Sequence, residues 1–426
     1  MTEGGGDSAL GAAAASVRTA TGLPGAVKGG AAGVGAAAWR RGAGIAGAAV
    51  GVVAAGAAVG VAMERLTVGR GMRRKARLAL DSVAPYGTLR GTPGRAVAED
   101  GTELYYEVDE PDPATCARAG RFFGRRPAPP VTVVFSHGYC LSQDSWHFQR
   151  AALRGAVRTV FWDQRSHGRS GRGRGQEPGR EEGTEPVSID LLGRDLKAVI
   201  DAAAPEGPLV LVGHSMGGMT MMALAAHYPG LIEERVVGAA FVGTSSGRLS
   251  EVTYGLPAVG MNLLRRTVLP GAFKLMSAQT ELVEKGRRAT ADLLGGIIKR
   301  YSFGSREVDP GVARFAERLI EATPVDVVAA FYPAFDAHDK ANALSAFDGR
   351  PVLVLAGEKD MITPADHSRA IAEALPAASL VVVPGAGHLV MLEQPGTVDA
   401  QLSALLTAAG AGAPARRLPS GEVGTP

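Results

Sequence analysis

Short apolar runs alternate with helical stretches along most of this chain, and the alternation predicts its architecture. Six of the runs have the length of buried strands, namely residues 131–135, 156–162, 208–212, 236–242, 351–357 and 379–383. Helical stretches such as Ile189–Ala203 separate them. Strands that alternate with helices in this way are typical of an α/β domain with a mainly parallel sheet and right-handed crossovers.

A β-hairpin is predicted ahead of these strands. The segments Arg95–Glu99 and Thr102–Tyr106 flank Asp100-Gly101, and this pair of residues favours a two-residue turn. The chain is therefore expected to enter its folded domain through a hairpin.

The alternation stops over residues 248–341. The helical apolar patterns Leu263–Leu275 and Thr290–Tyr301 fall in this insertion. Its apolar residues are core residues more often than pocket residues, yet they supply the candidates for an apolar acyl pocket: Met261, Leu264, Phe273, Met276, Phe331, Tyr332 and Phe335.

The most informative turn follows the strand at 208–212. In Gly213-His214-Ser215-Met216-Gly217 one serine stands between two glycines, and a helix-forming run continues to Tyr228. A strand, tight turn and helix in this order predict a nucleophile elbow, in which the glycines leave room for a crowded backbone. Gly243–Gly247 also matches G-x-S-x-G, but no comparable helix follows Ser245. Ser215 is therefore the predicted nucleophile, and Ser245 is predicted to be a loop residue.

A serine nucleophile needs a base, and the base must be held by a carboxylate. Asp360 lies in the turn after the strand at 351–357, at the sheet edge where open α/β sheets place their sites. A helix is predicted to follow, with Thr363 as its N-cap and Pro364 at its first position. Asp360 is the predicted acid, and Glu358 is the alternative.

The base should follow the acid along the chain. Two histidines lie beyond Asp360. His367 falls inside the predicted helix 363–375 and is expected to face solvent. His388 lies in the glycine-rich loop after the strand at 379–383, at the same sheet edge as the other two residues. His388 is the predicted general base.

An oxyanion hole needs backbone amides directed at the developing negative charge. Met216, directly after the nucleophile, is expected to supply one. The loop after the strand at 131–135 should supply the other through Tyr139, with Cys140 as the alternative. His137 is expected to brace this loop.

Together these motifs resemble the α/β-hydrolase superfamily, in particular the large group with a single cap domain, over roughly residues 94–406. His137-Gly138 matches the oxyanion motif. Asp163–Ser170 is similar to the family's D-x-R-G-x-G-x-S loop, with Ser166 where glycine is usual. Three further motifs match in the expected order: Gly213–Gly218, Gly357–Asp360 and Gly387-His388.

The resemblance implies an α/β-hydrolase fold with an inserted helical cap and no cofactor. A serine nucleophile excludes the epoxide-hydrolase and haloalkane-dehalogenase branches, which use an aspartate. We expect hydrolysis of a small carboxylic ester with a hydrophobic acyl group, through an acyl-enzyme. Two alternatives stay open. One is an acyltransferase or cofactor-free perhydrolase or haloperoxidase on the same triad, and the other is a non-catalytic ligand-binding protein of this fold.

The composition of the chain limits the kinds of partner and ligand that it is expected to bind. The formal charge of the chain is only +3, which gives no support to a nucleic-acid role. Two cysteines, Cys116 and Cys140, make no disulfide framework. No Cys/His cluster has metal-ligand spacing, so no metal is expected. The sequence does not specify an oligomeric state.

The N-terminal region predicts a membrane tether. Residues 42–63 are uncharged, and as a helix they would span ~33 Å, enough for a bilayer core. They are mostly Ala and Gly, which is weakly hydrophobic, so a soluble helical or disordered tail is the alternative. Basic residues such as Arg73, Arg74 and Lys75 follow at once. They favour a cytoplasmic catalytic domain, or contact with anionic lipid.

The predicted organisation follows from these patterns. It comprises a disordered Gly/Ala-rich N-terminus (1–41), a transmembrane helix (42–63), a basic linker (64–93), the first part of the hydrolase core (94–247), a helical cap (248–341), the second part of the core (342–407) and a disordered tail (408–426).

Overall fold

The computed structural model describes residues 86–112, 130–173, 185–252 and 300–411, with positions 267, 268, 271, 272, 279 and 283 of the insertion. The predicted transmembrane helix lies outside the described residues, as do most of the two helical patterns predicted between residues 263 and 301. Within the described ranges, no helix is both long and apolar enough to cross a bilayer.

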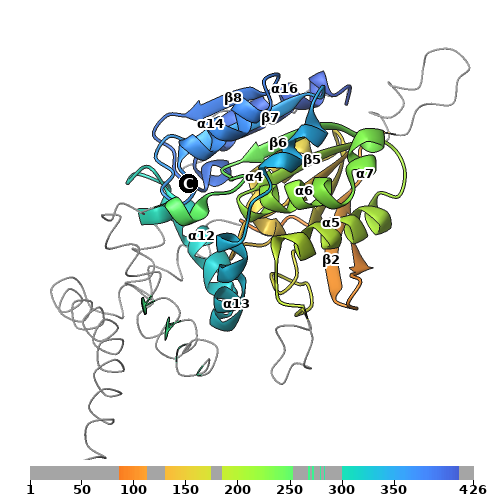
Figure 1. Ribbon diagram of the computed structural model, residues 1–426. Helices are drawn as coiled ribbons and strands as arrows, with labels where there is room; N and C mark the ends of the chain where they lie inside the picture. Colours follow the sequence, from red (N-terminus) through yellow and green to blue (C-terminus); the bar gives the residue numbers. More distant parts are fainter. Residues whose placement is uncertain are drawn as a thin grey trace, which may run out of the picture. The chain divides into compact units, whose positions relative to one another are not determined.

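Eight strands form one sheet, in the order β1-β2-β4-β3-β5-β6-β7-β8 (Figure 1). β2 pairs antiparallel with β1 and β4, and all other neighbours are parallel. The predicted mainly parallel sheet is therefore confirmed. The strands are β1 (Thr92–Val97), β2 (Glu103–Asp109), β3 (Thr132–Ser136), β4 (Arg158–Trp162), β5 (Leu209–His214), β6 (Val236–Val242), β7 (Val352–Gly357) and β8 (Ser379–Val383).

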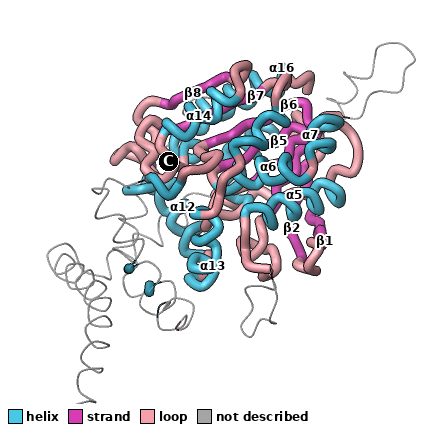
Figure 2. Tube along the Cα trace, in the orientation of Figure 1, coloured by secondary structure: helices cyan, strands magenta, loops and turns pink. Residues whose placement is uncertain are grey.

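Helices flank the sheet, as the cyan and magenta tubes of Figure 2 show. Ser188 is the N-cap of α5: its side chain accepts a hydrogen bond from the Leu191 amide, and this cap fixes the first turn of the helix. The helices are α4 (His147–Leu153), α5 (Ile189–Ala203), α6 (Met216–His227), α7 (Pro229–Arg235), α12 (Pro310–Ala322), α13 (Val325–Asp336), α14 (Ala365–Ala374), α15 (Val390–Glu393) and α16 (Pro395–Ala408), with 3-10 turns η1 (Gln143–Trp146), η3 (Leu249–Glu251) and η5 (Ala341–Phe347).

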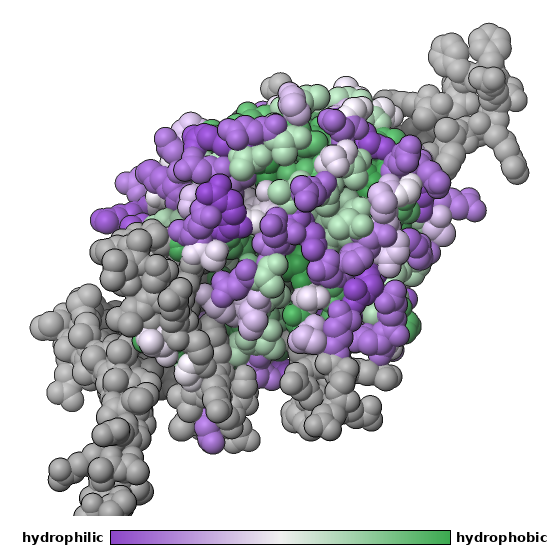
Figure 3. All heavy atoms as spheres, in the orientation of Figure 1, coloured by the Kyte–Doolittle hydropathy of each residue, from purple (hydrophilic) through white to green (hydrophobic). Residues whose placement is uncertain are grey.

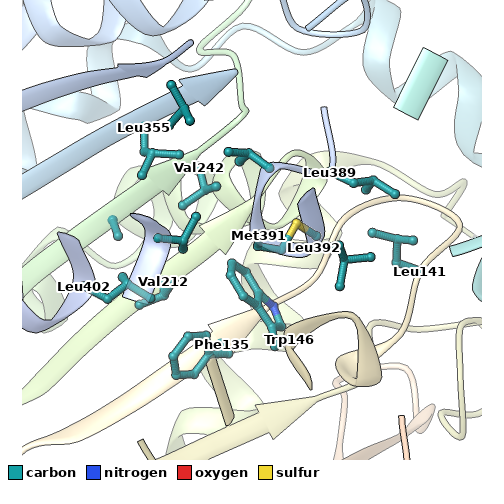
Figure 4. Close-up of a cluster of buried hydrophobic side chains, with 14 of the residues drawn as sticks. Phe135, Leu141, Trp146, Val212, Val242, Leu355, Leu389, Met391, Leu392 and Leu402 are labelled. Carbon is teal, nitrogen blue, oxygen red and sulfur yellow. The ribbon is translucent and has the colours of Figure 1, made fainter. Parts of the chain in front are cut away.

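The central strands are buried on both faces because successive side chains point to opposite sides of the sheet. In β5, Val210 and Val212 join one core with α4, α15 and α16, whereas Leu209 and Leu211 join a second core with α5, α6 and α14. Trp146 and Phe135 fill the first core, with ring centroids 5.2 Å apart (Figure 4). An aromatic pair of this kind adds about 0.5–1.5 kcal/mol to the effect of burial alone. The two cores hold the strand ends rigidly in place.

The hairpin at the start of the sheet is longer than predicted. β1 and β2 are joined by Ala98–Thr102, and the Ala98 amide donates to the Thr102 carbonyl oxygen at 2.9 Å. Gly101 adopts a φ of +83°, and the Thr102 amide donates to Asp100 Oδ1 at 3.1 Å. The expected two-residue turn is wrong, since these bonds place three residues in the loop and use only the glycine for a left-handed position.

Candidate active site

The predicted nucleophile lies at a strained turn between β5 and α6. Ser215 has a φ of +51°, and its amide donates to the Val242 carbonyl oxygen of β6 at 2.9 Å. A Cβ on Gly217 would lie 2.2 Å from the Ser136 carbonyl oxygen, so no larger residue fits there. Such backbone strain costs about 1–3 kcal/mol and persists only where the surroundings enforce it. The turn therefore has the strand, elbow and helix that the sequence predicts.

The structure brings the predicted acid and base together. His388 Nδ1 lies 2.8 Å from Asp360 Oδ2, although 28 residues separate them in sequence. Asp360 follows β7 and His388 follows β8, and parallel neighbours end at the same edge of the sheet. Both residues are buried, at 5% and 6% exposed. Little water reaches the bond, which keeps it strong.

The Asp360 carboxylate is fixed from two sides. Oδ1 accepts hydrogen bonds from the amides of Ile362 and Thr363, at 2.8 and 2.9 Å. Oδ2 accepts from His388 and lies 2.9 Å from Thr363 Oγ1. The alternative acid, Glu358, is exposed, and its carboxylate accepts from the Gly385 amide at 2.9 Å. Of the two carboxylates, Asp360 is the one placed at His388.

Thr363 does not cap a helix, contrary to the prediction. α14 begins at Ala365, and Pro364 occupies the N-cap position without a side-chain cap. The Thr363 hydroxyl lies instead within hydrogen-bond distance of the Gly243 carbonyl oxygen (2.8 Å) and of Asp360 Oδ2. It also lies 3.3 Å from His388 Nδ1. A buried carboxylate competes better for this hydroxyl than a solvent-exposed helix end, because charge-assisted hydrogen bonds are stronger.

The loop after β3 faces the nucleophile. A Cβ on Gly138 would lie 3.2 Å from Ser215 Cβ, so the two backbones are in close contact. The Cys140 amide donates to His167 Nε2 at 3.3 Å, whereas the Tyr139 amide has no acceptor among the described residues. Met216 is the first residue of α6, where helical amides have no partner within the helix. These contacts are compatible with the predicted oxyanion donors, the amides of Tyr139 and Met216.

Two buried histidines support this loop. His137 lies 2.7 Å from the Gly138 carbonyl oxygen through Nδ1, and its Nε2 accepts from the Gln164 amide at 2.9 Å. Burial lowers the pKa of His137 to about 4 and that of His167 to about 3. Both rings therefore stay neutral near pH 7, and the bracing role predicted for His137 agrees with its contacts. The sequence does not predict this role of His167, because its Nε2 accepts from the amide of Cys140, which lies 27 positions earlier in the chain.

Ser166 stands where the family usually has glycine, yet the turn keeps its shape. It adopts a φ of +64°, in the left-handed region that glycine favours. Its amide donates to the Gly171 carbonyl oxygen at 2.9 Å, and its hydroxyl accepts from the Gly173 amide at 3.1 Å. These hydrogen bonds help to offset the strain of the left-handed conformation at Ser166.

The second G-x-S-x-G match is a loop after β6, as predicted. Ser245 is fully buried, and its hydroxyl lies 2.6 Å from the Gly247 carbonyl oxygen and 2.8 Å from His367 Nδ1. His367 was expected to face solvent; it is half-buried instead, because one ring nitrogen contacts the buried serine. The first turn of α14 packs against the loop, and the sequence gives no sign of that contact. The Ser245 hydroxyl is thus occupied by contacts within the loop and with α14.

The candidate pocket residues divide into two groups. Met261, Leu264, Phe273 and Met276 lie outside the described residues. Phe331 is fully buried in an apolar cluster of α5, α6 and α13 that includes Met216, with Phe335 packed against it. Tyr332 is half-buried. Phe331 thus packs behind Met216 as core.

Tyr139 joins this apolar cluster to the oxyanion loop. Its hydroxyl donates to the Val328 carbonyl oxygen of α13 at 2.5 Å, and its ring lies 5.0 Å from that of Phe335. α13 is therefore bonded directly to Tyr139, the residue that the sequence predicts as an oxyanion donor.

A cavity of about 710 Å³ opens beside Asp360. Among the described residues it is bounded by the loop after β6, the exit from the insertion and the start of α14. Its lining is Ser246, Gly247, Arg248, Glu251, Val252, Asp339, Ala341, Asp360, Met361, Pro364, Asp366, His367 and Ala370. This volume is within the range of small-molecule sites.

Comparison with known proteins identifies the family. The family model of the alpha/beta hydrolase fold matches residues 131–395. An acetyltransferase component (dihydrolipoyllysine-residue) of the acetoin cleaving system of Pseudomonas putida is 27% identical over 316 residues, 73% of this chain and 72% of that protein. The sn-1-specific diacylglycerol lipase of Mus musculus is 27% identical over 278 residues, 62% of this chain and 76% of the lipase. A solved thermophilic esterase from Thermogutta terrifontis is similar with a TM-score of 0.54 at 22% identity, covering 74% of this chain and 98% of the esterase.

Proposed function

The chain belongs to the α/β-hydrolase fold family of hydrolases, and from that premise we propose that it cleaves carboxylic esters through Ser215, Asp360 and His388. The observation that carries the proposal is the bond of 2.8 Å between His388 Nδ1 and Asp360 Oδ2. A neutral imidazole that donates from Nδ1 has its lone pair on Nε2, which is the form a general base needs.

The reaction proceeds in two halves. Ser215 Oγ attacks the ester carbonyl carbon while His388 Nε2 takes its proton, and the amides of Tyr139 and Met216 stabilise the oxyanion. The intermediate collapses, His388 protonates the departing alcohol, and the acyl group stays on Ser215. Water then attacks the acyl-enzyme with His388 again as base, which releases the acid. Asp360 keeps its charge throughout and stabilises the imidazolium.

A hydrophobic acyl group is the substrate we favour. The diacylglycerol lipase relative is named for a lipid ester, and the cluster around Met216, Phe331 and Phe335 places apolar side chains behind the predicted oxyanion donor. We further propose that α12 and α13 belong to a cap formed by residues 248–341, which lie between β6 and β7 in the chain. The Tyr139–Val328 bond supports a cap attached to the site.

Acyl transfer is the second candidate, because a relative of similar identity is named as an acetyltransferase component. It uses the same acyl-enzyme, with an alcohol or thiol in place of water. Product analysis with and without an added acceptor separates the two, since a transferase forms a new ester or thioester and a hydrolase forms free acid.

For the N-terminus we propose a membrane tether through residues 42–63, with the hydrolase domain in the cytoplasm. The uncharged run and the basic residues that follow it support this proposal.

The triad is tested first with the two serines that match G-x-S-x-G. Ser215→Ala should lower hydrolysis of p-nitrophenyl esters about 10⁴-fold or more, as loss of a triad member does elsewhere. Ser245→Ala is the matched control and should retain a substantial fraction of activity. Acyl chains from two to sixteen carbons locate the preferred length. The assignment is wrong if Ser245→Ala is the inactive variant.

A further inference from the structure

His214 is a buried side chain that the proposed reaction does not use. It ends β5, directly before Ser215, and is completely buried. Its Nε2 lies 3.0 Å from the main-chain oxygen of His388, and the two rings are 4.7 Å apart. A carbonyl oxygen only accepts hydrogen bonds, so Nε2 carries the proton and donates it.

The opposite edge of the ring faces the oxyanion loop. A Cβ on Gly138 would lie 2.6 Å from His214 Nδ1, and Nδ1 has no hydrogen-bond partner among the described residues. A Cβ on Gly243, beside Asp360, would lie 3.6 Å from His214 Cδ2. One ring therefore fills the space between the loops that carry the predicted oxyanion donor, the acid and the base.

The bond to His388 completes a series of anchors along the base loop. The Gly387 amide donates to Glu393 Oε2 at 2.7 Å, and the Leu389 amide donates to the Ser302 carbonyl oxygen at 2.9 Å. The His388 carbonyl is held by His214 between these two bonds. Three successive residues are thus fixed in a loop that its glycines would otherwise leave free.

The charge of His214 matters because the neighbouring ring of His388 takes up a proton in the proposed reaction. Burial, and next the charge of His388, lower the pKa of His214 well below its ordinary value. A neutral His214 adds no repulsion when His388 takes the proton of Ser215. A cationic side chain at this position would oppose that step.

We propose that His214 is a positioning residue for the general base, which it holds through the main chain of His388 and packs against the oxyanion loop. The inference rests on the proposed function and adds to it a residue outside the triad. A base displaced by a fraction of an ångström loses alignment with the serine, and misplacement of about 1 Å can cost 10²-fold in rate.

The test compares three substitutions with a matched control. His214→Gln keeps an amide donor near the position of Nε2, His214→Asn has a donor that is too short to reach, and His214→Leu has none. His338→Leu is the control. His338 is buried and donates from Nε2 to the Ser245 carbonyl oxygen at 2.8 Å, and its Nδ1 has no hydrogen-bond partner in the described part of the chain. kcat and KM for a p-nitrophenyl ester are measured, with thermal unfolding as a check on the fold.

We expect His214→Leu and His214→Asn to lower kcat about 10–100-fold with KM within about twofold, and His214→Gln to recover most of the loss. His338→Leu should leave kcat within about threefold. The inference fails if the Gln variant is as impaired as the Asn variant, if His338→Leu lowers kcat equally, or if the folded variants keep full kcat. The Asn and Gln variants decide the outcome if His214→Leu does not fold.

Ser215→Ala and His388→Ala are assayed alongside the His214 variants. Hydrolysis that survives those two changes overturns the proposed function, whereas their inactivity with an unaffected His214 series overturns this inference alone.

Discussion

The orientation of the Asp360 carboxylate is fixed by contacts with several neighbours at once. Two amides fix Oδ1, and the Thr363 hydroxyl and His388 ring lie at Oδ2. Its side chain can therefore adopt one orientation only, and the imidazole that donates to it can adopt one tautomer.

Exchange of the acid for its amide tests this arrangement. Asp360→Asn should leave the fold intact but offer an NH₂ group to His388, which favours the wrong tautomer and lowers turnover by about four orders of magnitude. Glu358→Gln removes a charge from an exposed side chain and should change kcat little. The kcat of both variants is measured with a short-chain ester. An inactive Glu358→Gln together with an active Asp360→Asn would mean that Glu358, two residues earlier, is the acid.

The sequence was sufficient to propose these residues but not their hydrogen bonds. Strand-end positions follow from apolar runs, so Asp360 and His388 could be placed at one sheet edge. Thr363 could not be assigned correctly, because a threonine before a proline has the same pattern whether its hydroxyl caps a helix or binds a carboxylate. The partner of His214 lies 174 residues further along the chain, and no local pattern identifies it.

At the scale of elements, strands and helices of the core were predicted well. β6, β8 and α5 have the bounds read from the sequence, because each is a long periodic or apolar run with clear ends. The hairpin was misjudged, since Asp-Gly fits a three-residue loop with a left-handed glycine as well as a two-residue turn. The packing of α13 on the oxyanion loop could not be predicted, because it joins residues 189 positions apart.

The tie between α13 and the oxyanion loop has a measurable consequence. Tyr139→Phe removes the hydrogen bond to the Val328 carbonyl oxygen and should cost about 0.5–1.5 kcal/mol in stability. We expect kcat/KM to fall several-fold for long-chain esters and less for acetate, because the long chain needs the proposed cap in place. Tyr105→Phe also removes one tyrosine hydroxyl bond, to Glu107, and is the control for stability. Equal losses for all chain lengths would argue against a link between α13 and acyl binding.

At the scale of the whole molecule, the face of the described domain seen in Figure 3 carries polar residues interspersed with apolar ones. Every residue of the proposed mechanism lies within 86–411, and the formal charge of the whole chain is small. The catalytic unit is therefore expected to act without its N-terminal region.

Removal of residues 1–77 tests the tether. The truncated protein should stay in the supernatant and keep its kcat, whereas the full chain should sediment with membranes and resist carbonate or high-salt extraction. Basic residues near anionic lipid contribute about 1 kcal/mol each, so salt alone would release a purely electrostatic contact. Quantitative recovery of the full chain without detergent would overturn the anchor. Digestion of the hydrolase domain from outside intact spheroplasts would reverse its orientation.

The sheet order places the proposed base, though it is buried, in the loop that directly follows an edge strand. Among the strands that the structure describes, β8 is the last in the sheet and pairs with β7 alone, and Leu380 on it is 39% exposed. Edge strands open at lower free energy than the centre of a sheet. As the temperature rises, His388 should therefore separate from Asp360 while β3, β5 and β6 are still intact. Activity should therefore be lost on heating before the sheet unfolds, and an enzyme inactivated in this way should still be largely folded and should regain activity on cooling.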